Sequence, residues 1–340
     1  TELFNWRWMF LYNIPLGICV LILGYLFIDL KDKDQTLLSK IDFQGILFLA
    51  ISLIALLIFL EEGERRDWFY SNFIISFFFI FLLFITFFIK RELTTYNPVI
   101  DIKIFLNKNF VIGSVILCIF AINLYIPVFL IPIVLSRMHH IDPINIGLIV
   151  STLGLGMMLA GPIAGRVLHL YGVKPVIIIG SFITGLATYM QSFITAEFLY
   201  LDFFWSQFLK GVGTQFLFIG SQFIGLSKLN LSLINNASAM FNLTMRLTAA
   251  VSIAISSNYF ITWNKQFLSQ ISENHNSDII ILNELAKNNF DNDFLRNLYF
   301  LIERESFVMA FNKASYLSVW TVILPILLLF FLNKEQYKNK

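Results

Sequence analysis

Nine apolar runs separated by short polar stretches set the pattern of this 340-residue chain. Each run is close to the length of about 20 helical residues that crosses a hydrocarbon core of about 30 Å. None alternates apolar and polar residues at every second position, as the strands of a membrane β-barrel do. We therefore predict an all-α integral membrane protein, a helical bundle with nine transmembrane helices at residues 8–28, 43–60, 73–89, 110–136, 144–165, 176–196, 203–226, 237–262 and 314–332.

The composition agrees with a membrane protein. Hydrophobic residues make up 57% of the chain and charged residues 14%, whereas soluble domains are about half apolar and a quarter charged. The net charge of +2 comes from cations in short loops, so no nucleic-acid partner is expected. Cys19 and Cys118 both lie inside apolar runs, so the sequence predicts no disulfide framework.

The cations of the short loops predict the orientation. Four of them, at positions 7, 65, 66 and 137, lie on one side of the predicted membrane, if the long stretch after residue 262 is left aside. Because cytoplasmic loops carry the excess of Lys and Arg, the other side is cytoplasmic. We expect a multi-pass protein of the inner membrane with a cytoplasmic C-terminus and an external start, which fits a chain that lacks preceding helices. The cytoplasmic cations are Lys31, Lys33, Lys40, Lys90, Arg91, Lys103, Lys108, Arg166, Lys174, Lys228, Lys334, Lys338 and Lys340.

The polar gap after the fifth run combines glycines with cations. Gly161 and Gly165 are four residues apart, so on a helix they form a smooth face that a neighbouring backbone can approach. Arg166 and Lys174 flank Gly172, which permits a tight reversal. We interpret the stretch as a gating loop between two helices. An ordinary positive-inside turn with packing glycines explains it as well.

Three further motifs follow one another along the chain. Residues 6–17 read WRWMFLYNIPLG, Asp67-Trp68 lies between the second and third runs, and residues 97–110 read NPVIDIKIFLNKNF. Together with the glycine-arginine loop, these motifs resemble the fourteen-helix drug:proton antiporters of the major facilitator superfamily. The resemblance covers nearly the whole chain.

The resemblance implies a domain layout. Residues 1–30 correspond to the last helix of the N-terminal half, and residues 31–109 to a linker helix pair with a cytoplasmic segment. Residues 110–340 correspond to the C-terminal six-helix bundle with an outer loop at 263–313. The family has five earlier helices, which carry its antiporter motif and its acidic residues. We expect these to be missing from the start of the sequence or supplied by another efflux subunit.

The predicted outer loop has a pattern of its own. Between residues 279 and 311, apolar residues recur at helical spacing among charged ones. This pattern predicts amphipathic helices that lie on the membrane surface or cap the bundle. A solvated loop without regular structure is the alternative.

Lys210 and Arg246 are the two ionisable residues inside the predicted spans, at depths of roughly 10 and 14 Å from opposite faces. A charge so deep requires water or a partner. Gln207 and Thr214 share a helical face with Lys210, which favours a polar stripe along a substrate cavity. A structural clamp on carbonyl oxygens or a glutamine is the alternative, and for Arg246 the family resemblance favours a structural site. The other cavity candidates are Gln215, Asn123 and Asn242.

Asn123, Pro127 and Pro132 interrupt the fourth predicted span. Prolines inside a membrane helix free backbone carbonyls and bend the helix. A bent gating helix and simple kinked packing both fit this pattern.

Motifs for enzyme chemistry are weak. His139-His140 beside Asp142 stands in a short predicted loop without a second group at metal-ligand spacing. Gly154, Gly156 and Gly161 lie inside a predicted membrane helix and have the wrong spacing for a dinucleotide site. We therefore expect no enzyme activity, no catalytic residues, no metal and no cofactor.

The sequence, with the resemblance, predicts a secondary transporter. On this interpretation it exports drugs or other lipophilic compounds by alternating access and is coupled to protons, and its partners are a small-molecule substrate, protons and membrane lipid. Because the nine runs contain no Asp or Glu, the coupling acid is expected in the missing helices. The alternatives are a transporter of an anionic solute and a truncated membrane protein without transport.

Overall fold

A computed structural model of the chain describes residues 7–27, 42–95, 102–139, 142–195, 197, 200–227, 229, 231–274 and 292–331. Within these ranges every regular element is helical, as predicted. The α-helices are α1 (Trp8–Leu11), α2 (Asn13–Phe27), α3 (Phe43–Glu62), α4 (Asn72–Thr94), α5 (Lys108–His139), α6 (Pro143–Tyr171), α7 (Val173–Gln191), α8 (Tyr200–Leu226), α9 (Leu231–Asn274), α11 (Asn292–Thr321) and α12 (Ile323–Leu328). Short 3₁₀ helices are η2 (Glu64–Arg66), η3 (Trp68–Tyr70), η4 (Ile102–Leu106) and η5 (Leu329–Phe331).

The described helices confirm a membrane-spanning helical bundle. Seven of them are long and apolar enough to cross a membrane: α3, α4, α5, α6, α7, α9 and the stretch Phe300–Phe331. Helix α2 is apolar but has 15 residues, and α8 has 27 residues but includes Gln207 and Lys210. All nine predicted runs are therefore helical over most of their described residues, and residues 192–195 of the run 176–196 lie beyond the end of α7.

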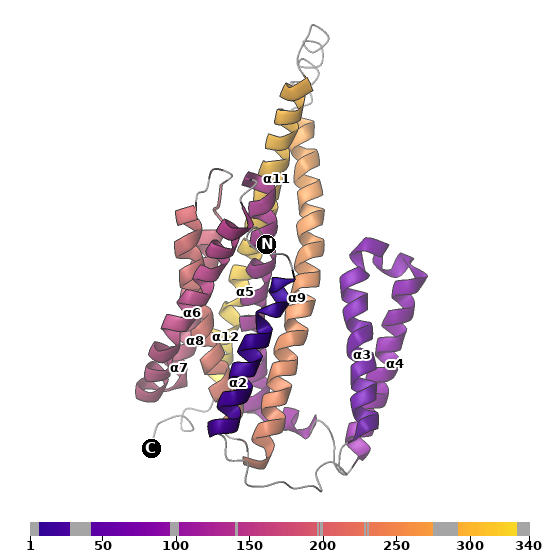
Figure 1. Cartoon of the computed structure of the whole chain (residues 1–340), viewed down its shortest axis with the longest axis vertical. Helices are drawn as coiled ribbons and strands as arrows, with labels where there is room; N and C mark the ends of the chain where they lie inside the picture. The colour runs from indigo at the N-terminus through magenta and orange to yellow at the C-terminus, as the bar shows by residue number, and fades with distance from the viewer. Residues whose placement is uncertain are drawn as a thin grey trace.

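Helix α8 lies at the centre of the main bundle. It packs against α5, α6 and α7, while α9 packs along α5 and α11 (Figure 1). Most buried side chains of this bundle are aliphatic or aromatic, although buried Ser, Thr, Asn, Gln and Lys side chains lie among them. Phe110 of α5 meets Phe241 of α9 edge to face at 5.1 Å between ring centroids. Burial of these apolar surfaces holds the helices in register.

Glycines set the closest helix contact in the bundle. A methyl group at Gly156 of α6 would overlap the carbonyl oxygen of Phe208, and one at Gly211 of α8 would overlap that of Leu153. The two backbones therefore touch where only glycine fits. The sequence analysis assigned such a face to Gly161 and Gly165, and this was wrong for the described chain: a methyl at Gly165 would meet nothing within 4 Å, and one at Gly161 would meet only the Gln215 side chain, at 3.7 Å.

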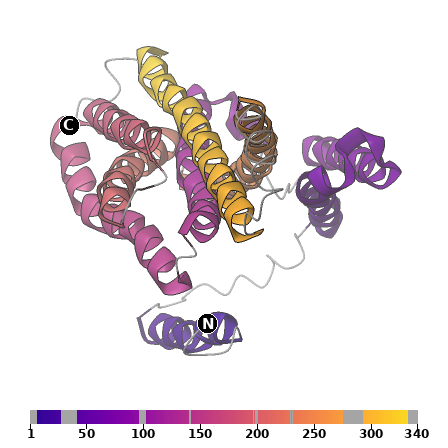
Figure 2. The same cartoon turned by 90° about the horizontal axis from the view of Figure 1, so that it is seen from above.

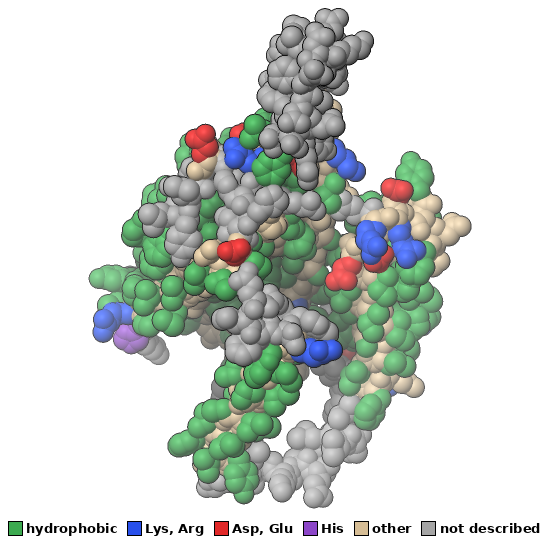
Figure 3. All heavy atoms as spheres, turned by 45° about the horizontal axis from the view of Figure 1, so that its top comes forward, with side chains coloured by type: hydrophobic (Ala, Val, Ile, Leu, Met, Phe, Trp, Pro, Cys, Tyr) green, Lys and Arg blue, Asp and Glu red, His purple; other side chains and the backbone are tan. Residues whose placement is uncertain are grey.

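Helices α3 and α4 form a hairpin beside the main bundle, and α3 is the helix that packs on α9 (Figures 1 and 2). Much of the hairpin surface is apolar, and charged side chains gather at one of its ends (Figure 3). At the other end, Asp42 caps α3 by accepting a hydrogen bond from the Gly45 amide at 3.1 Å. The same carboxylate accepts one from Arg91 Nε of α4 at 3.0 Å, so a single buried group ties the two helices together.

The Asp42 contact predicts a pH effect on stability. Its hydrogen bond with Arg91 is the main reason that the pKa of Asp42 lies below the ordinary value. A lowered folded-state pKa stabilises the fold above about pH 4, the range of the unfolded carboxyl, and the stabilisation is lost as the pH falls through the lowered pKa. We expect Asp42→Asn to lower the thermal midpoint at neutral pH and to have less effect in acid. A difference from wild type that stayed constant from about pH 7 to about pH 3 would contradict this.

The tip of the hairpin has a strained turn at the Asp67-Trp68 motif. Both residues have positive φ values, 55° and 49°, a conformation that is uncommon for residues other than glycine. Trp68 donates its backbone amide to the Gly63 carbonyl at 2.7 Å, and its ring packs edge to face against Phe59 at 5.4 Å. The motif thus closes the hairpin tip by packing the Trp68 ring against Phe59. Residues 97–101 of the longer family-like segment lie outside the described residues.

Helices α9 and α11 extend beyond the other helices as a pair (Figure 1). Residues 263–274 continue α9 without a break, and residues 292–313 belong to α11. This differs from the predicted loop at 263–313 with separate surface helices, whose residues 275–291 lie outside the described ranges. The extension is stabilised by contacts between the two helices, since Ser306 of α11 donates a hydrogen bond to Asn264 of α9 at 2.7 Å.

Candidate functional site

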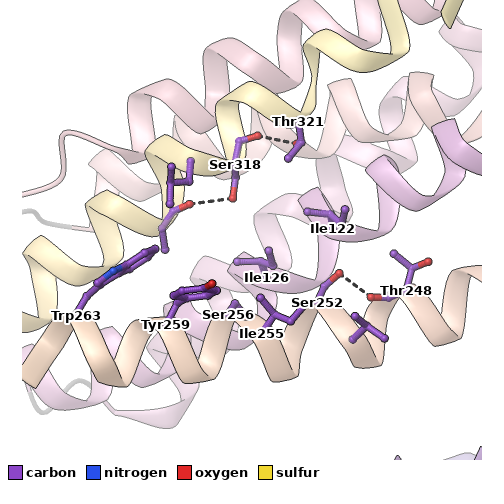
Figure 4. A pocket seen from close by; sticks show the side chains of 13 residues that line it. Ile122, Ile126, Thr248, Ser252, Ile255, Ser256, Tyr259, Trp263, Ser318 and Thr321 are labelled. Atoms are coloured by element: carbon purple, nitrogen blue, oxygen red, sulfur yellow. Dashed lines mark hydrogen bonds between the residues drawn. The ribbon is translucent and has the colours of Figure 1, made fainter. Parts of the chain in front are cut away.

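A cavity of about 340 Å³ lies between α5, α9 and α11 (Figure 4). Its size is at the lower end of the range of small-molecule sites. Half-exposed side chains of α9 and α11, including Ile255, Tyr259 and Leu317, form its rim, so it opens to the side of the bundle. The lining residues are Ile122, Ile126, Thr248, Val251, Ser252, Ile255, Ser256, Tyr259, Trp263, Ala314, Leu317, Ser318 and Thr321.

The hydroxyl groups of this cavity are already used as donors. Ser252 donates to the Thr248 carbonyl at 2.6 Å, and Ser318 donates to the Ala314 carbonyl at 2.9 Å (Figure 4). Thr321 donates to the Ser318 carbonyl at 2.7 Å. Their oxygen lone pairs therefore remain as acceptors on an otherwise apolar wall. Such a surface suits a lipophilic molecule that can donate one or a few hydrogen bonds.

One end of the cavity is aromatic and cationic. The rings of Tyr259 and Trp263 stack one turn apart on α9, with centroids 5.2 Å apart. Lys313 of α11 places its Nζ 4.8 Å from the Trp263 ring centroid and 5.5 Å from that of Phe267. A cation held over aromatic faces in this way is stabilised by the ring quadrupoles.

Asn123 connects α5 to the edge of this cavity. Its side chain is fully buried and donates hydrogen bonds to the Ile119 carbonyl at 3.0 Å and to the Thr321 hydroxyl at 2.9 Å. Its Oδ1 atom has no partner within the described chain. Helix α5 runs through Pro127 and Pro132 without interruption, so the polar side chain and the prolines lie on one continuous element.

Lys210 lies at the interface of α8 and α7, and it does not line the cavity between α5, α9 and α11. Its exposed fraction is 2%, and its Nζ donates to the Gln191 Oε1 atom at 2.9 Å. Gln207 and Thr214 are also buried, and the Thr214 hydroxyl donates to the Lys210 carbonyl at 2.7 Å. The Gln191 Nε2 and Gln207 Oε1 atoms have no partner within the described chain. This arrangement matches the clamp on a glutamine that the sequence analysis gave as the alternative.

Asn242 and Arg246 face away from the rest of the described chain. They are one turn apart on α9, and both are exposed. Asn242 donates to the Ser238 carbonyl at 3.0 Å. A polar pair in the middle of an apolar span is costly against lipid, so this face requires water or further protein. Gln215 is half-buried.

The predicted gating loop joins α6 to α7. Gly172 ends α6 with φ at 81° and donates its amide to the Leu168 carbonyl at 3.0 Å, so a residue tolerant of positive φ is needed there. Arg166 is exposed near the end of α6, and Lys174 is half-buried in the first turn of α7. The geometry is that of a tight turn with its cations at the surface.

The sequence did not lead us to predict the wall of hydroxyl groups that Thr248, Ser252 and Ser256 form in the cavity. It also did not lead us to predict the role of Gln191 as the partner of Lys210. A signal for the wall was present, because Thr248, Ser252 and Ser256 follow one another at intervals of four and therefore share one helical face. Gln191 gave no comparable signal, since its role depends on which helix packs against α8. Within the described residues no group of three His, Cys, Asp or Glu side chains is placed to hold a metal ion.

Curated proteins similar to this chain are named for multidrug export or for resistance to toxic compounds. The multidrug export protein EmrB of Haemophilus influenzae is 28% identical over 277 residues, which cover 80% of this chain and 53% of the relative. The colistin resistance protein EmrB of Acinetobacter baumannii is 25% identical over 273 residues, with the same coverage. The fatty acid resistance protein FarB of Neisseria gonorrhoeae is 26% identical over 253 residues, 74% of this chain and 49% of the relative.

The chain is thus similar to proteins named for multidrug export, and a relative in Bacillus subtilis, 24% identical over 272 residues, is named as an MFS-type transporter. No protein-family model matches it. It spans about half the length of the curated relatives it matches. The resemblance read from the short motifs is thus confirmed by similarity over most of the chain.

Proposed function

We propose that this chain is part of a proton-coupled secondary transporter of the inner membrane that exports drugs or other lipophilic compounds. The observation that carries the proposal is its similarity, over about four-fifths of its length, to proteins named for multidrug export. A bundle of membrane-length helices with an apolar cavity supports it. The C-terminus faces the cytoplasm, as the distribution of loop cations favours.

The polar face of α9 is where this bundle meets other helices of the transporter. Asn242 and Arg246 are exposed on that helix, and burial against further protein or a water-filled path would relieve their cost. In this layout residues 31–109 form the linker with its hairpin, and residues 110–340 form one half that rocks against another. Gly161, Gly165, Arg166, Gly172 and Lys174 make up the gating loop between two of its helices.

The cavity of α5, α9 and α11 contributes a substrate-binding surface. Its hydroxyl oxygens, apolar side chains and aromatic end suit lipophilic compounds without requiring a specific shape. Lys210 supports this half by holding α8 to α7 through Gln191. Gln207 and Thr214 are buried beside it on α8, where the Thr214 hydroxyl donates to the Lys210 carbonyl. Asn123 links the cavity wall to α5 through Thr321.

A lipophilic anion is the second candidate substrate. Lys313 supplies a cation next to the aromatic end of the cavity, and one relative is named for fatty acid resistance. Competition of fatty acids with lipophilic cations for export by the full-length transporter would separate the two candidates.

Proton coupling is tested with the chain by itself. Most acidic residues of its described helices lie near the helix ends, and Glu303 and Glu305 of α11 precede the predicted span at 314–332. The coupling carboxylate is therefore placed in other helices of the transporter. We expect residues 1–340 in liposomes to show no uptake of ethidium driven by a pH gradient, whereas the full-length transporter shows it. Uptake by residues 1–340 alone would overturn the placement of the acid, and no uptake by the full-length transporter would overturn the proposed function.

A further inference from the structure

A second cavity separates the α3–α4 hairpin from the main bundle. Its volume is about 280 Å³, and its walls come from α3 on one side and from α5 and α9 on the other. We call it the hairpin crevice. Seven of its eight lining residues carry no charge, and Glu61 is the eighth: Leu57, Leu60, Glu61, Phe129, Ala250, Ile253, Ala254 and Ser257.

Glu61 has a free carboxylate within the described chain. The next residue, Glu62, accepts hydrogen bonds from Arg65 and Arg66 at 3.2 Å each. Glu61 has neither a hydrogen bond nor an ion pair there, although the two arginines are a few residues away. Arg65 and Arg66 are thus paired with Glu62. The Glu61 carboxylate is therefore free to interact with a molecule in the crevice.

Glu61 lies near the end of α3, at the mouth of the crevice. It lies 19 residues beyond the cap residue Asp42, roughly 28 Å along the axis of α3. This is close to the full thickness of the hydrocarbon core, so the residue reaches the membrane surface, and it is exposed. Leu57, one turn earlier, lines the crevice at membrane depth. The crevice therefore combines an anionic mouth with an apolar interior.

We propose that the hairpin crevice binds a lipophilic cation, with its charge beside Glu61 and its apolar groups between α3 and α9. Phe129 adds an aromatic side chain to the wall, and aromatic faces attract cations in addition to apolar groups. A lipophilic anion would be repelled by Glu61, and a neutral compound would leave the carboxylate unpaired. Charge complementarity thus selects the cation.

The site adds to the proposed function without depending on it. Binding in the crevice requires neither a proton gradient nor transport, and it uses none of the residues of the cavity between α5, α9 and α11. In the membrane, it would collect cationic compounds at the surface, at the contact between hairpin and bundle.

The test measures the affinity of the purified chain for ethidium, a lipophilic cation, in nanodiscs of zwitterionic lipid. Because the new pair is partly exposed to water, we expect Glu61→Gln to raise the dissociation constant about fivefold. The matched control is Glu305→Gln, which removes an exposed carboxylate of α11 outside the crevice wall, and it should leave the affinity unchanged. The affinity for 8-anilinonaphthalene-1-sulfonate, an anionic dye, should not fall in Glu61→Gln.

A steric variant tests the location of the site independently of charge. Ala254→Leu adds bulk to the α9 wall of the crevice and should weaken ethidium binding while the thermal midpoint stays near that of wild type. Equal ethidium affinities for wild type and Glu61→Gln would overturn the proposal. So would an equal loss in both glutamine variants, because this would indicate a general effect of surface charge.

Discussion

Gly211→Ala is expected to prevent stable assembly of the main bundle. The added methyl would overlap the Leu153 carbonyl oxygen of α6, a backbone atom that cannot rotate away. Helices α6 and α8 would have to separate along their length, and overpacking of this kind costs about 3 kcal/mol or more. We expect the thermal midpoint of the purified protein in detergent to fall by on the order of 10 °C, or the protein to aggregate.

A matched glycine on α6 serves as the control for this prediction. Gly165 has open space at the position of a methyl group, so Gly165→Ala should fold as wild type. Gly156→Ala, on the opposing side of the same contact, should behave like Gly211→Ala because its methyl would overlap the Phe208 carbonyl oxygen. Similar midpoints for the Gly165 and Gly211 variants would contradict the proposed role of the close contact.

Gln191→Leu is expected to be more destabilising than the loss of both members of its pair. The Gln191 amide oxygen is the acceptor for the buried Lys210 ammonium at 2.9 Å. Leucine would leave that ammonium without an acceptor inside the bundle, at a cost of about 3–5 kcal/mol. In Lys210→Met/Gln191→Leu an apolar pair replaces the polar one, and most of the stability should return.

Thermal unfolding of the four proteins of this double-mutant cycle measures the coupling. If the interface acts as a clamp, the two single substitutions will be strongly non-additive. If Lys210 instead gained its stabilisation from water in a substrate path, Gln191→Leu would have little effect on the midpoint. In the full-length transporter the same variants would then change substrate range.

The apolar runs predicted the helices well, but not where they end. Residues 263–274 contain several polar side chains, such as Asn264 and Lys265, so the pattern alone indicated a loop. The helix continues there because α11 packs alongside, with Asn264 bonded to Ser306 and Lys313 above Trp263. Such tertiary contacts override the local pattern, and a single sequence does not reveal them.

The sequence predicted polar residues inside the spans, but none of the residues that line the cavity between α5, α9 and α11. The depth of Lys210 followed from counting along the run, but its burial did not, because Arg246 was predicted at a similar depth and is exposed. The contact of Lys210 with Gln191 depends on which helix neighbours α8, and helical periodicity carries no such information. The glycines are a second example of information that periodicity does not carry. Several glycines lie on α6, but only the packing of α8 shows that Gly156 contacts another backbone and that Gly165 does not.

The unbroken course of α9 has a mechanical consequence. Its 44 residues are roughly 66 Å long, about twice the thickness of a hydrocarbon core. A continuous helix is stiff, so a tilt of its membrane part turns the outer part by the same angle. A tilt of about 10° would move the end of a lever arm of about 30 Å by roughly 5 Å. A spectroscopic label near the outer end of α9, at Ser269 for example, would therefore report motions of the bundle from a place that water-soluble probes can reach.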